Sequence, residues 1–308
     1  MNMIVPHELL EIPEQVAGRE TEDGVEFPFS PQLRAYFQKD QGAIWSRWNP
    51  APRPCFNPRL LGDIRMYQEF LAATKGQIEV GAETHAINYV VLASSIPGVF
   101  NLGGDLDLFK MLIGKQDRAG LLYYGRACID VLYRNYISHE LPATTISLVQ
   151  GDCLGGGFEA ALSSDVIIAE RSSRFGFPEI LFNLFPGMGA YSFLDRKVGQ
   201  KLAEQLITSG RLYSAEEMRA LGIVDLVVED GQGEAGVSSF IASGQRTQVA
   251  HFGLAATRRR VHGIDFAELM DVVEIWVDCA LRLNPRDLKL MHRLVSRQNG
   301  LGESHLIH

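Results

Sequence analysis

The sequence predicts an α/β fold in one large domain, and three features support this prediction. Short apolar runs typical of strands alternate with segments of helical periodicity through the middle of the chain. Two glycine-rich corners each join a strand-like run to a helix-like segment. With 308 residues and 46% hydrophobic content, the chain can also bury a sizeable core, so we expect it to be globular.

Composition and periodicity divide the chain into three regions. Residues 1–31 are polar with scattered prolines, which predicts an irregular or strand-like leader. Residues 32–231 carry the alternating strands and helices and form the expected core. In residues 232–308 strand signals are few, and periodicity over 266–281 and 285–297 predicts a helical C-terminal region.

Within the core, the spacing of apolar residues predicts the individual elements. Strand-like runs lie at 87–92, 145–150 and 166–169, with a short strand at 175. Helical spacing is found at 58–73, 106–113, 118–138, 190–198 and 201–208.

Two groups of side chains are interpreted as structural. The helix predicted at 118–138 carries an aromatic stripe, and such a stripe is usually core packing or a subunit contact, so we assign it no chemistry. The stripe consists of Tyr123, Tyr124, Tyr133 and Tyr136. The charge run 258–260, three arginines, most often marks a solvated surface and is only a weak signal for docking of an acidic carrier.

Charge and cysteine usage exclude several classes of protein. The net charge of −8 argues against a nucleic-acid partner, and no apolar run approaches the length of a membrane span. No signal peptide is recognisable, so we expect a cytoplasmic protein. Cys55, Cys128, Cys153 and Cys279 are far apart and lack metal-ligand spacing. We therefore expect reduced thiols, no disulfide framework and neither a metal nor a cofactor.

The first glycine corner is the candidate centre of the chemistry. Its sequence, Asp-Cys-Leu-Gly-Gly-Gly-Phe-Glu at 152–159, follows a strand-like run and opens a helix. Backbone N–H groups in such a corner suit a developing negative charge. A second carboxylate, Glu179, follows twenty residues after Glu159, and paired carboxylates suit proton transfer beside a thioester carbonyl. The alternative is a tight turn with a glutamate that only complements the helix dipole.

A second glycine corner favours the catalytic interpretation. Val-Phe-Asn-Leu-Gly-Gly-Asp-Leu, at 99–106, again follows a strand-like run and precedes a helix. An oxyanion hole needs two N–H donors from different parts of the chain, and two such corners could supply them.

These two corners, together with Ser164-Asp165, Phe-Gly-Phe-Pro-Glu at 175–179 and the segment 215–225, resemble the crotonase (enoyl-CoA hydratase/isomerase) superfamily. The similarity runs in order from about residue 43 to about residue 228. It implies a spiral of ββα units with a C-terminal helical region that closes the acyl pocket and packs between subunits. A homotrimer or a dimer of trimers is also implied.

Residues 179–194 and Asn-Leu-Gly-Gly at 101–104 most resemble one branch of this superfamily, the bacterial diffusible-signal-factor synthases of the RpfF type. The resemblance implies that the enzyme dehydrates a 3-hydroxyacyl thioester of acyl carrier protein to the cis-2-enoyl form. It further implies a thioesterase step that releases a cis-2-unsaturated fatty acid, a quorum-sensing signal. Synthases of this type also bind regulatory sensor proteins.

Residue by residue, the resemblance implies the members of the site. Glu159 and Glu179 match the catalytic glutamates, and which one is the acid is left open. Gly104 and Gly156 match the N–H donors of the oxyanion hole. The implied substrate-binding residues are Gly103, Leu154, Gly155, Met188 and Trp276.

Other functions remain open. A trans-2-enoyl-CoA hydratase, acting on CoA rather than carrier-protein thioesters, would share every catalytic residue. A Δ3–Δ2 enoyl-CoA isomerase relies on one glutamate at the position of Glu179, so the presence of both argues against it. A non-enzymatic interaction protein would be favoured by loss of a glutamate or a corner glycine, and none is lost.

Overall fold

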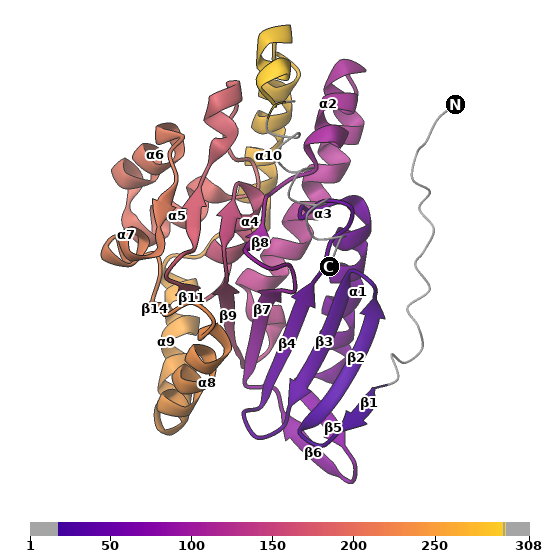
Figure 1. The fold of residues 1–308 in the computed structure, drawn as a ribbon, viewed down its shortest axis with the longest axis vertical. Coiled ribbons are helices and arrows are strands. Elements are labelled where there is room, and N and C mark those ends of the chain that lie inside the picture. Colours follow the sequence, from indigo (N-terminus) through magenta and orange to yellow (C-terminus); the bar gives the residue numbers. More distant parts are fainter. Residues whose placement is uncertain (1–17, 292, 294–308) are drawn as a thin grey trace.

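The computed structural model describes residues 18–291 and 293, and it confirms the predicted α/β class (Figure 1). An eight-stranded sheet has the order β1-β2-β3-β4-β7-β9-β11-β14. A four-stranded sheet has the order β13-β12-β10-β8, and β5 and β6 form a separate pair.

The strands are β1 Arg19–Thr21, β2 Gly24–Ser30, β3 Leu33–Gln38, β4 Ala43–Trp48, β5 Gln77–Val80, β6 Glu83–Ala86, β7 Tyr89–Ser94, β8 Val99–Asn101, β9 Thr144–Val149, β10 Asp152–Leu154, β11 Val166–Glu170, β12 Arg174–Gly176, β13 Tyr213–Ser214 and β14 Leu226–Val228. The α-helices are α1 Pro58–Thr74, α2 Leu106–Gly114, α3 Arg118–Tyr136, α4 Gly156–Leu162, α5 Ala190–Val198, α6 Gln200–Ser209, α7 Ala215–Ala220, α8 Gly233–Gly244, α9 Gln248–Val261 and α10 Phe266–Ala280. Short 3₁₀ turns are η1 Ser138–Glu140, η2 Pro178–Phe182 and η3 Gln245–Thr247.

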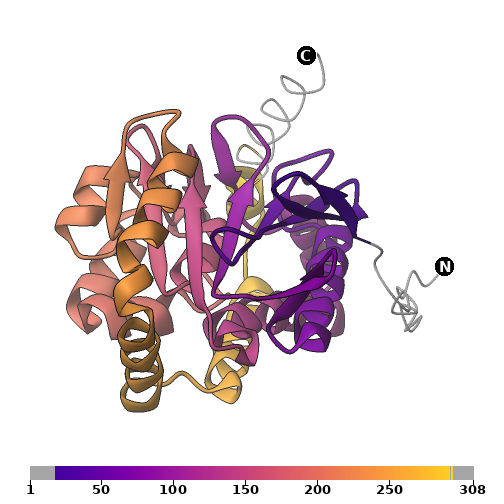
Figure 2. The same cartoon turned by 90° about the horizontal axis from the view of Figure 1, so that it is seen from below.

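The parallel part of the main sheet is covered on both faces, whereas in β3 buried residues alternate with more exposed ones. Strands β1 to β4 are antiparallel, and β4, β7, β9, β11 and β14 run parallel. Strands buried on both faces read as nearly continuous apolar runs, as β9 and β11 do. Val237 and Ile241 of α8 cover one face, and the larger core lies on the other, against α1, α3 and α4 (Figure 2).

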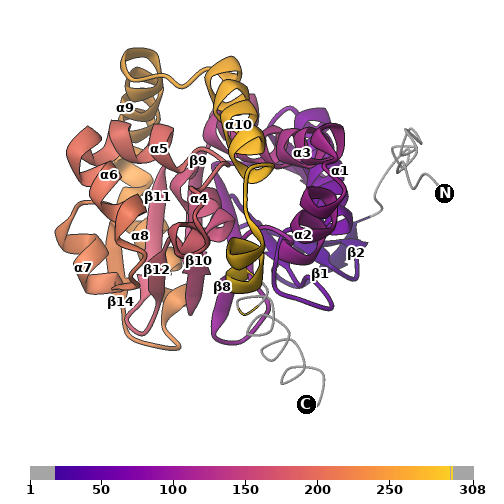
Figure 3. The same ribbon diagram turned by 90° about the horizontal axis from the view of Figure 1, so that it is seen from above.

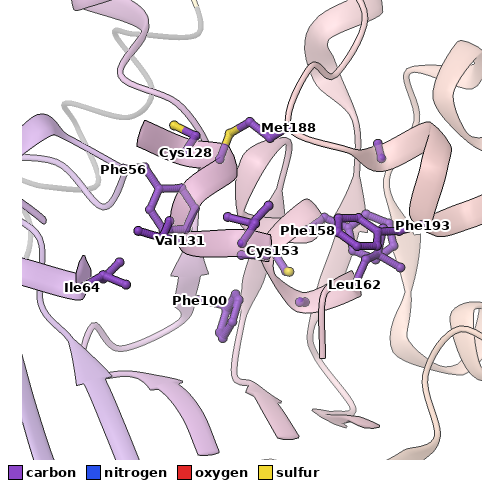
Figure 4. Packing of buried hydrophobic residues seen from close by; sticks show 14 of the residues in the cluster. Phe56, Ile64, Phe100, Cys128, Val131, Cys153, Phe158, Leu162, Met188 and Phe193 are labelled. Carbon is purple, nitrogen blue, oxygen red and sulfur yellow. The ribbon is translucent and has the colours of Figure 1, made fainter. Parts of the chain in front are cut away.

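Helix α4 lies inside the larger core. All of its residues are buried, including Phe158, whose ring stacks on Phe177 with centroids 4.9 Å apart. Figure 4 shows Phe158 and Leu162 of this helix beside Phe193 of α5. The helix that opens at the first glycine corner is therefore held by packing along its length.

Each glycine corner follows a strand of the four-stranded sheet, which corrects one expectation. The sequence predicted one strand-like run before each corner, at 87–92 and at 145–150. They form β7 and β9 of the main sheet, and the three-residue strands β8 and β10 intervene. Strands this short carry no periodic signal.

The ends of the chain refine the expected boundaries. Strands β1 and β2 pair within the main sheet, so the sheet begins upstream of the boundary predicted at residue 32. After β14 the described residues are helical, with α8, α9 and α10 followed by a helix from residue 285 to 291. Most of the leader predicted at 1–31, and the end of the helix predicted at 285–297, lie outside the described residues.

Candidate active site

Three parallel strands bring the predicted motifs to one edge of the four-stranded sheet. In its register Cys153 of β10 lies opposite Asn101 of β8, and Leu154 lies opposite Gly176 of β12. The carboxyl ends of parallel strands meet at the same edge of a sheet. The segments that follow these ends carry the corner residues 103–104, the corner residues 155–156 and Glu179.

The two corners touch through glycines that have no room for a side chain. Gly103 has φ +93°, and a Cβ there would lie 2.9 Å from the amide nitrogen of Gly156. Gly155 has φ +51°, and a Cβ there would overlap Oε1 of Glu179. Both positions need glycine for backbone conformation and for close approach. The turn interpretation therefore holds for these two residues, and it does not exclude a chemical role for their neighbours.

Gly104 and Gly156 each leave an N–H group uncommitted. Gly156 is the first residue of α4, so its N–H has no acceptor within the helix. On either side of Gly104, the N–H of Gly103 donates to Asn101 Oδ1 (2.8 Å) and that of Asp105 donates to Tyr124 Oη (3.2 Å). In the described part of the chain, neither the Gly104 nor the Gly156 N–H has an assigned acceptor.

A cavity of about 630 Å³ connects these groups. Its size suits a small-molecule site, and its lining is mostly apolar with few polar groups. Of the residues predicted for the site, those that line the cavity are Gly104, Leu154, Gly156, Glu159, Glu179, Met188 and Trp276. The other two, Gly103 and Gly155, shape the corners behind it.

Glu159 is fixed by backbone donors. Its side chain is buried in the first turn of α4, and Oε1 accepts hydrogen bonds from the N–H groups of Met188 (2.7 Å) and Ala190 (2.9 Å). Burial, and then the charge of Glu179, raise the pKa of Glu159 to about 8, although the two N–H donors oppose this shift. Both donors bind Oε1, and within the described residues no backbone N–H is assigned to Oε2.

Glu179 lies on the 3₁₀ turn η2 and is less constrained. The residue is half-buried, yet Oε2 is enclosed and has no hydrogen-bond partner among the described residues. Burial raises the pKa of Glu179 to about 7. Near neutral pH, one carboxyl group of the pair can therefore be protonated while the other is ionised.

Met188 and Trp276 both line the cavity. A Cβ on Gly156 would lie 2.6 Å from the sulfur of Met188, so this side chain packs directly on the first corner. Trp276 belongs to α10, which packs beside α3 (Figure 3), and its ring centroid lies 4.9 Å from that of Phe109. The C-terminal helical region thus contributes a wall of the cavity.

Sequence reasoning missed several lining residues. Phe109, Tyr124 and Val273 also line the cavity, and Tyr124 belongs to the aromatic stripe to which we assigned no chemistry. Helices α2 and α3, which carry Phe109 and Tyr124, are neighbours in the chain, whereas α10, which carries Val273, lies far downstream. No local pattern distinguishes a residue at this wall from an ordinary core residue.

Two other groups named from the sequence, Cys153 and the charge run 258–260, have structural roles. Cys153 is buried, and burial raises its pKa well above the usual range, which favours the neutral thiol over a nucleophilic thiolate. Arg258 and Arg260 are exposed, as a solvated charge run predicts, but Arg259 is half-buried, and both Arg258 and Arg259 are ion-paired with Asp165.

Within the described residues, no group of three or more His, Cys, Asp or Glu side chains could hold a metal ion. In the same part of the chain, no helix combines the length and the apolar character needed to cross a membrane.

Residues 68–245 match the family described as enoyl-CoA hydratase/isomerase. This match covers more than half of the 308 residues, so the chain belongs to that family. The resemblance expected from the two glycine corners is confirmed at the level of the superfamily.

Curated relatives include hydratases of CoA thioesters. Human mitochondrial methylglutaconyl-CoA hydratase is 32% identical over 146 residues, which cover 47% of this chain and 41% of that protein. Mevalonyl-coenzyme A hydratase of Beauveria bassiana is 44% identical over 86 residues, 28% of this chain and 31% of that protein. The chain spans about half the length, or less, of the curated relatives that it matches.

Solved structures share the fold. An enoyl-CoA hydratase from Bacillus halodurans superposes with a TM-score of 0.70 at 21% identity, covering 85% of this chain and 99% of that chain. Human mitochondrial delta3-delta2-enoyl-CoA isomerase superposes with a TM-score of 0.70 at 20% identity, covering 86% of this chain and 97% of that chain. DspI of Pseudomonas aeruginosa superposes with a TM-score of 0.62 at 22% identity, covering 79% of this chain and 89% of that chain.

Proposed function

We propose that the chain is a lyase that removes water from a 3-hydroxyacyl thioester. The observation that supports this function best is the enclosed carboxylate pair, Glu159 and Glu179, in one cavity with the N–H groups of Gly104 and Gly156. Acid, base and two donors for a carbonyl oxygen are the groups that such an elimination requires.

In this proposal the thioester carbonyl accepts hydrogen bonds from Gly104 and Gly156. The α4 dipole adds to the polarisation at Gly156, which lowers the cost of forming an enolate. The ionised carboxylate removes the C2 proton, and the protonated one gives its proton to the leaving 3-hydroxyl. The products are a 2-enoyl thioester and water, and the pair has exchanged its protonation states.

We further propose the narrower activity of a diffusible-signal-factor synthase. The acyl group comes from acyl carrier protein, the product has the cis-2 geometry, and a glutamate activates water to hydrolyse the thioester. The similarity of residues 179–194 supports this activity, and Met188 and Trp276 line the cavity as an acyl pocket would require. A homotrimer or dimer of trimers, and binding of a sensor protein, belong to the same proposal.

The second candidate is a trans-2-enoyl-CoA hydratase. The curated relatives favour it, because those named above are hydratases of CoA thioesters. The same carboxylate pair would add water to the double bond instead of removing it. An isomerase is less favoured, because Glu159 lines the cavity together with Glu179.

One experiment separates these functions. The purified chain is incubated with 3-hydroxyacyl thioesters of acyl carrier protein and of CoA, and the products are analysed by mass spectrometry and chromatography. Release of free cis-2-enoic acid is the expected result. A trans-2-enoyl-CoA product without free acid would replace the synthase by the hydratase, and no turnover of either thioester would refute both. The Glu159→Gln/Glu179→Gln double variant controls for spontaneous hydrolysis.

A further inference from the structure

We propose that Tyr124 is a positioning residue for the carbonyl-binding N–H group of Gly104. This inference rests on the proposed function of the two glycine corners. It arises from a chain of three hydrogen bonds that begins and ends on the residues flanking Gly104.

The first hydrogen bond orients the peptide group that contains the Gly104 N–H. The carbonyl oxygen of Gly103 accepts from the N–H of Phe56 at 2.8 Å. In a trans peptide the C=O and the following N–H point in opposite directions. The Gly104 N–H is therefore directed away from Phe56, on the side opposite to this hydrogen bond.

The other two hydrogen bonds pass through the Tyr124 hydroxyl. It donates to the carbonyl oxygen of Phe56 and accepts from the N–H of Asp105 at 3.2 Å. The N–H of Phe56 thus holds Gly103, the residue before Gly104. The Tyr124 hydroxyl joins Phe56 to Asp105, the residue after Gly104. The Tyr124 side chain therefore connects the hydrogen bonds on both sides of the proposed donor, Gly104.

Tyr124 is well placed to transmit the rigidity of α3 to this loop. The residue is 4% exposed, and its ring packs edge-on against Phe109 with centroids 5.1 Å apart. A Cβ on Gly104 would lie 2.6 Å from the Phe109 ring and 3.6 Å from the Tyr124 oxygen. Both aromatic residues therefore lie directly against Gly104, and both line the cavity.

The segment that carries Phe56 supports the same loop at two further points. Arg53 Nη2 forms an ion pair with Asp105 Oδ1 (2.9 Å), and the N–H of Leu102 donates to the carbonyl of Pro54 (2.8 Å). Without the Tyr124 hydroxyl these contacts remain, so the loop is expected to stay folded. The Phe56 carbonyl and the Asp105 N–H would, however, lose the hydroxyl that joins them and keep only the β-bridge between Phe56 and Gly104, and weakly paired buried backbone groups favour local rearrangement.

The test is Tyr124→Phe, with Tyr133→Phe as the matched control. Tyr133 lies on the same helix, is half-buried against Phe266, and its hydroxyl has no assigned hydrogen bond among the described residues. We expect Tyr124→Phe to lower kcat by ~10- to 100-fold, since displacing a reacting group by about 1 Å can cost this much. KM should change less than about threefold. Tyr133→Phe should match the wild type.

A spectroscopic readout separates positioning from general damage. The probe is the ketone octanoyl-carba(dethia)-coenzyme A, labelled with ¹³C at its carbonyl, which the enzyme can neither hydrolyse nor dehydrate. Its carbonyl stretch should fall in frequency when it binds the wild type, because hydrogen bonds polarise the C=O group. Tyr124→Phe should bind the probe and lose a large part of this shift. Probe binding also counts folded sites, so turnover can be expressed per competent site.

The outcomes distinguish the two proposals. A full carbonyl shift and normal kcat in Tyr124→Phe would refute the positioning role and leave the proposed function intact. A raised KM with an unchanged shift would make Tyr124 an acyl contact instead. No shift in the wild type would refute the oxyanion pair itself. Should Tyr124→Phe yield too little folded protein, 3-fluorotyrosine at 124 must retain kcat and shift, because it keeps the hydroxyl, and failure of this rescue would also overturn the proposal.

Discussion

The two glutamates of the cavity differ in how firmly each is held. Glu159 is anchored through two backbone N–H groups, whereas Oε2 of Glu179 has no partner among the described residues. The sequence predicts both carboxylates because each lies in a recognisable motif. It could not predict the anchor of Glu159, since Met188 and Ala190 are about 30 residues away and reach it only through the turn before α5.

Replacing either glutamate should separate chemistry from folding. We expect Glu159→Gln and Glu179→Gln each to lower turnover by ~10²-fold or more, because each removes an acid–base group. The double variant should be far from additive if the two act as a unit. Turnover is measured with folding checked by circular dichroism. Near-normal activity in either single variant would contradict the assignment.

The same substitutions should change how stability depends on pH. The pKa of Glu159 rises from 4.5 to about 8 on folding, so between these values the folded state retains a proton that the unfolded state has lost. The stabilisation that this retained proton gives to the folded state is complete below the unfolded-state pKa of Glu159. It is lost as the pH rises through the folded-state pKa of Glu159. Glu159→Gln cannot titrate. Its melting temperature relative to the wild type should therefore increase from about pH 5 to about pH 9. A difference in melting temperature that does not change with pH would mean that folding does not raise the pKa of Glu159.

Gly156→Val tests the N–H donor of the first corner. The new side chain would collide with Met188 and intrude on the proposed thioester site, so turnover should be abolished while a folded fraction survives. Gly114→Val is the control, because this glycine ends α2 in open space without a positive φ. Activity is normalised to folded protein. Wild-type specific activity in the folded Gly156→Val fraction would refute the donor role.

At the scale of elements, local periodicity predicts the long helices well. The ranges predicted for α1, α2 and α3 end within two residues of the observed bounds. Strands β8 and β10 were missed, because three residues are too few for a periodic pattern. Their pairing depends on hydrogen bonds between segments about 50 residues apart, which no local signal encodes.

The carboxylate of Asp165 binds two arginines of helix α9, which also contacts the core through Ala255 and through the hydrogen bond of Arg259 to Ser138. Arg258 and Arg259 donate to Oδ1 of Asp165 at 2.6 and 3.0 Å, while Thr145 and Ser138 donate to Oδ2. Asp165→Asn removes the charge and should lower the free energy of unfolding by about 2 kcal/mol, discounted because Arg258 is half-exposed. Urea unfolding measures this loss, and amide hydrogen exchange should accelerate in α9.

Asp271→Asn serves as the control for this prediction. Asp271 is exposed on α10 and has no assigned ion pair among the described residues, so its substitution should stay within about 0.5 kcal/mol of the wild type. Equal effects of the two substitutions would show that Asp165 does not hold α9.

At the scale of the whole molecule, the fold class and the order of the motifs could be predicted, whereas the wall of the cavity could not. Phe109, Tyr124 and Trp276 are separated by up to 167 positions and meet only when α10 packs beside α3. Each reads as an ordinary core aromatic in the sequence. The shape of the acyl site is therefore a property of tertiary packing rather than of any motif.

The shared sheet edge described above also bears on how such a protein can change over evolution. Each motif is a short contiguous piece of chain, and the register of β8, β10 and β12 fixes where each piece starts. A substitution away from the contacts between the corners, which Gly103 and Gly155 make, can therefore alter one chemical group while its neighbours stay in place. New reactions on this scaffold can arise through single, separately tolerated steps, without any redesign of the core that carries them.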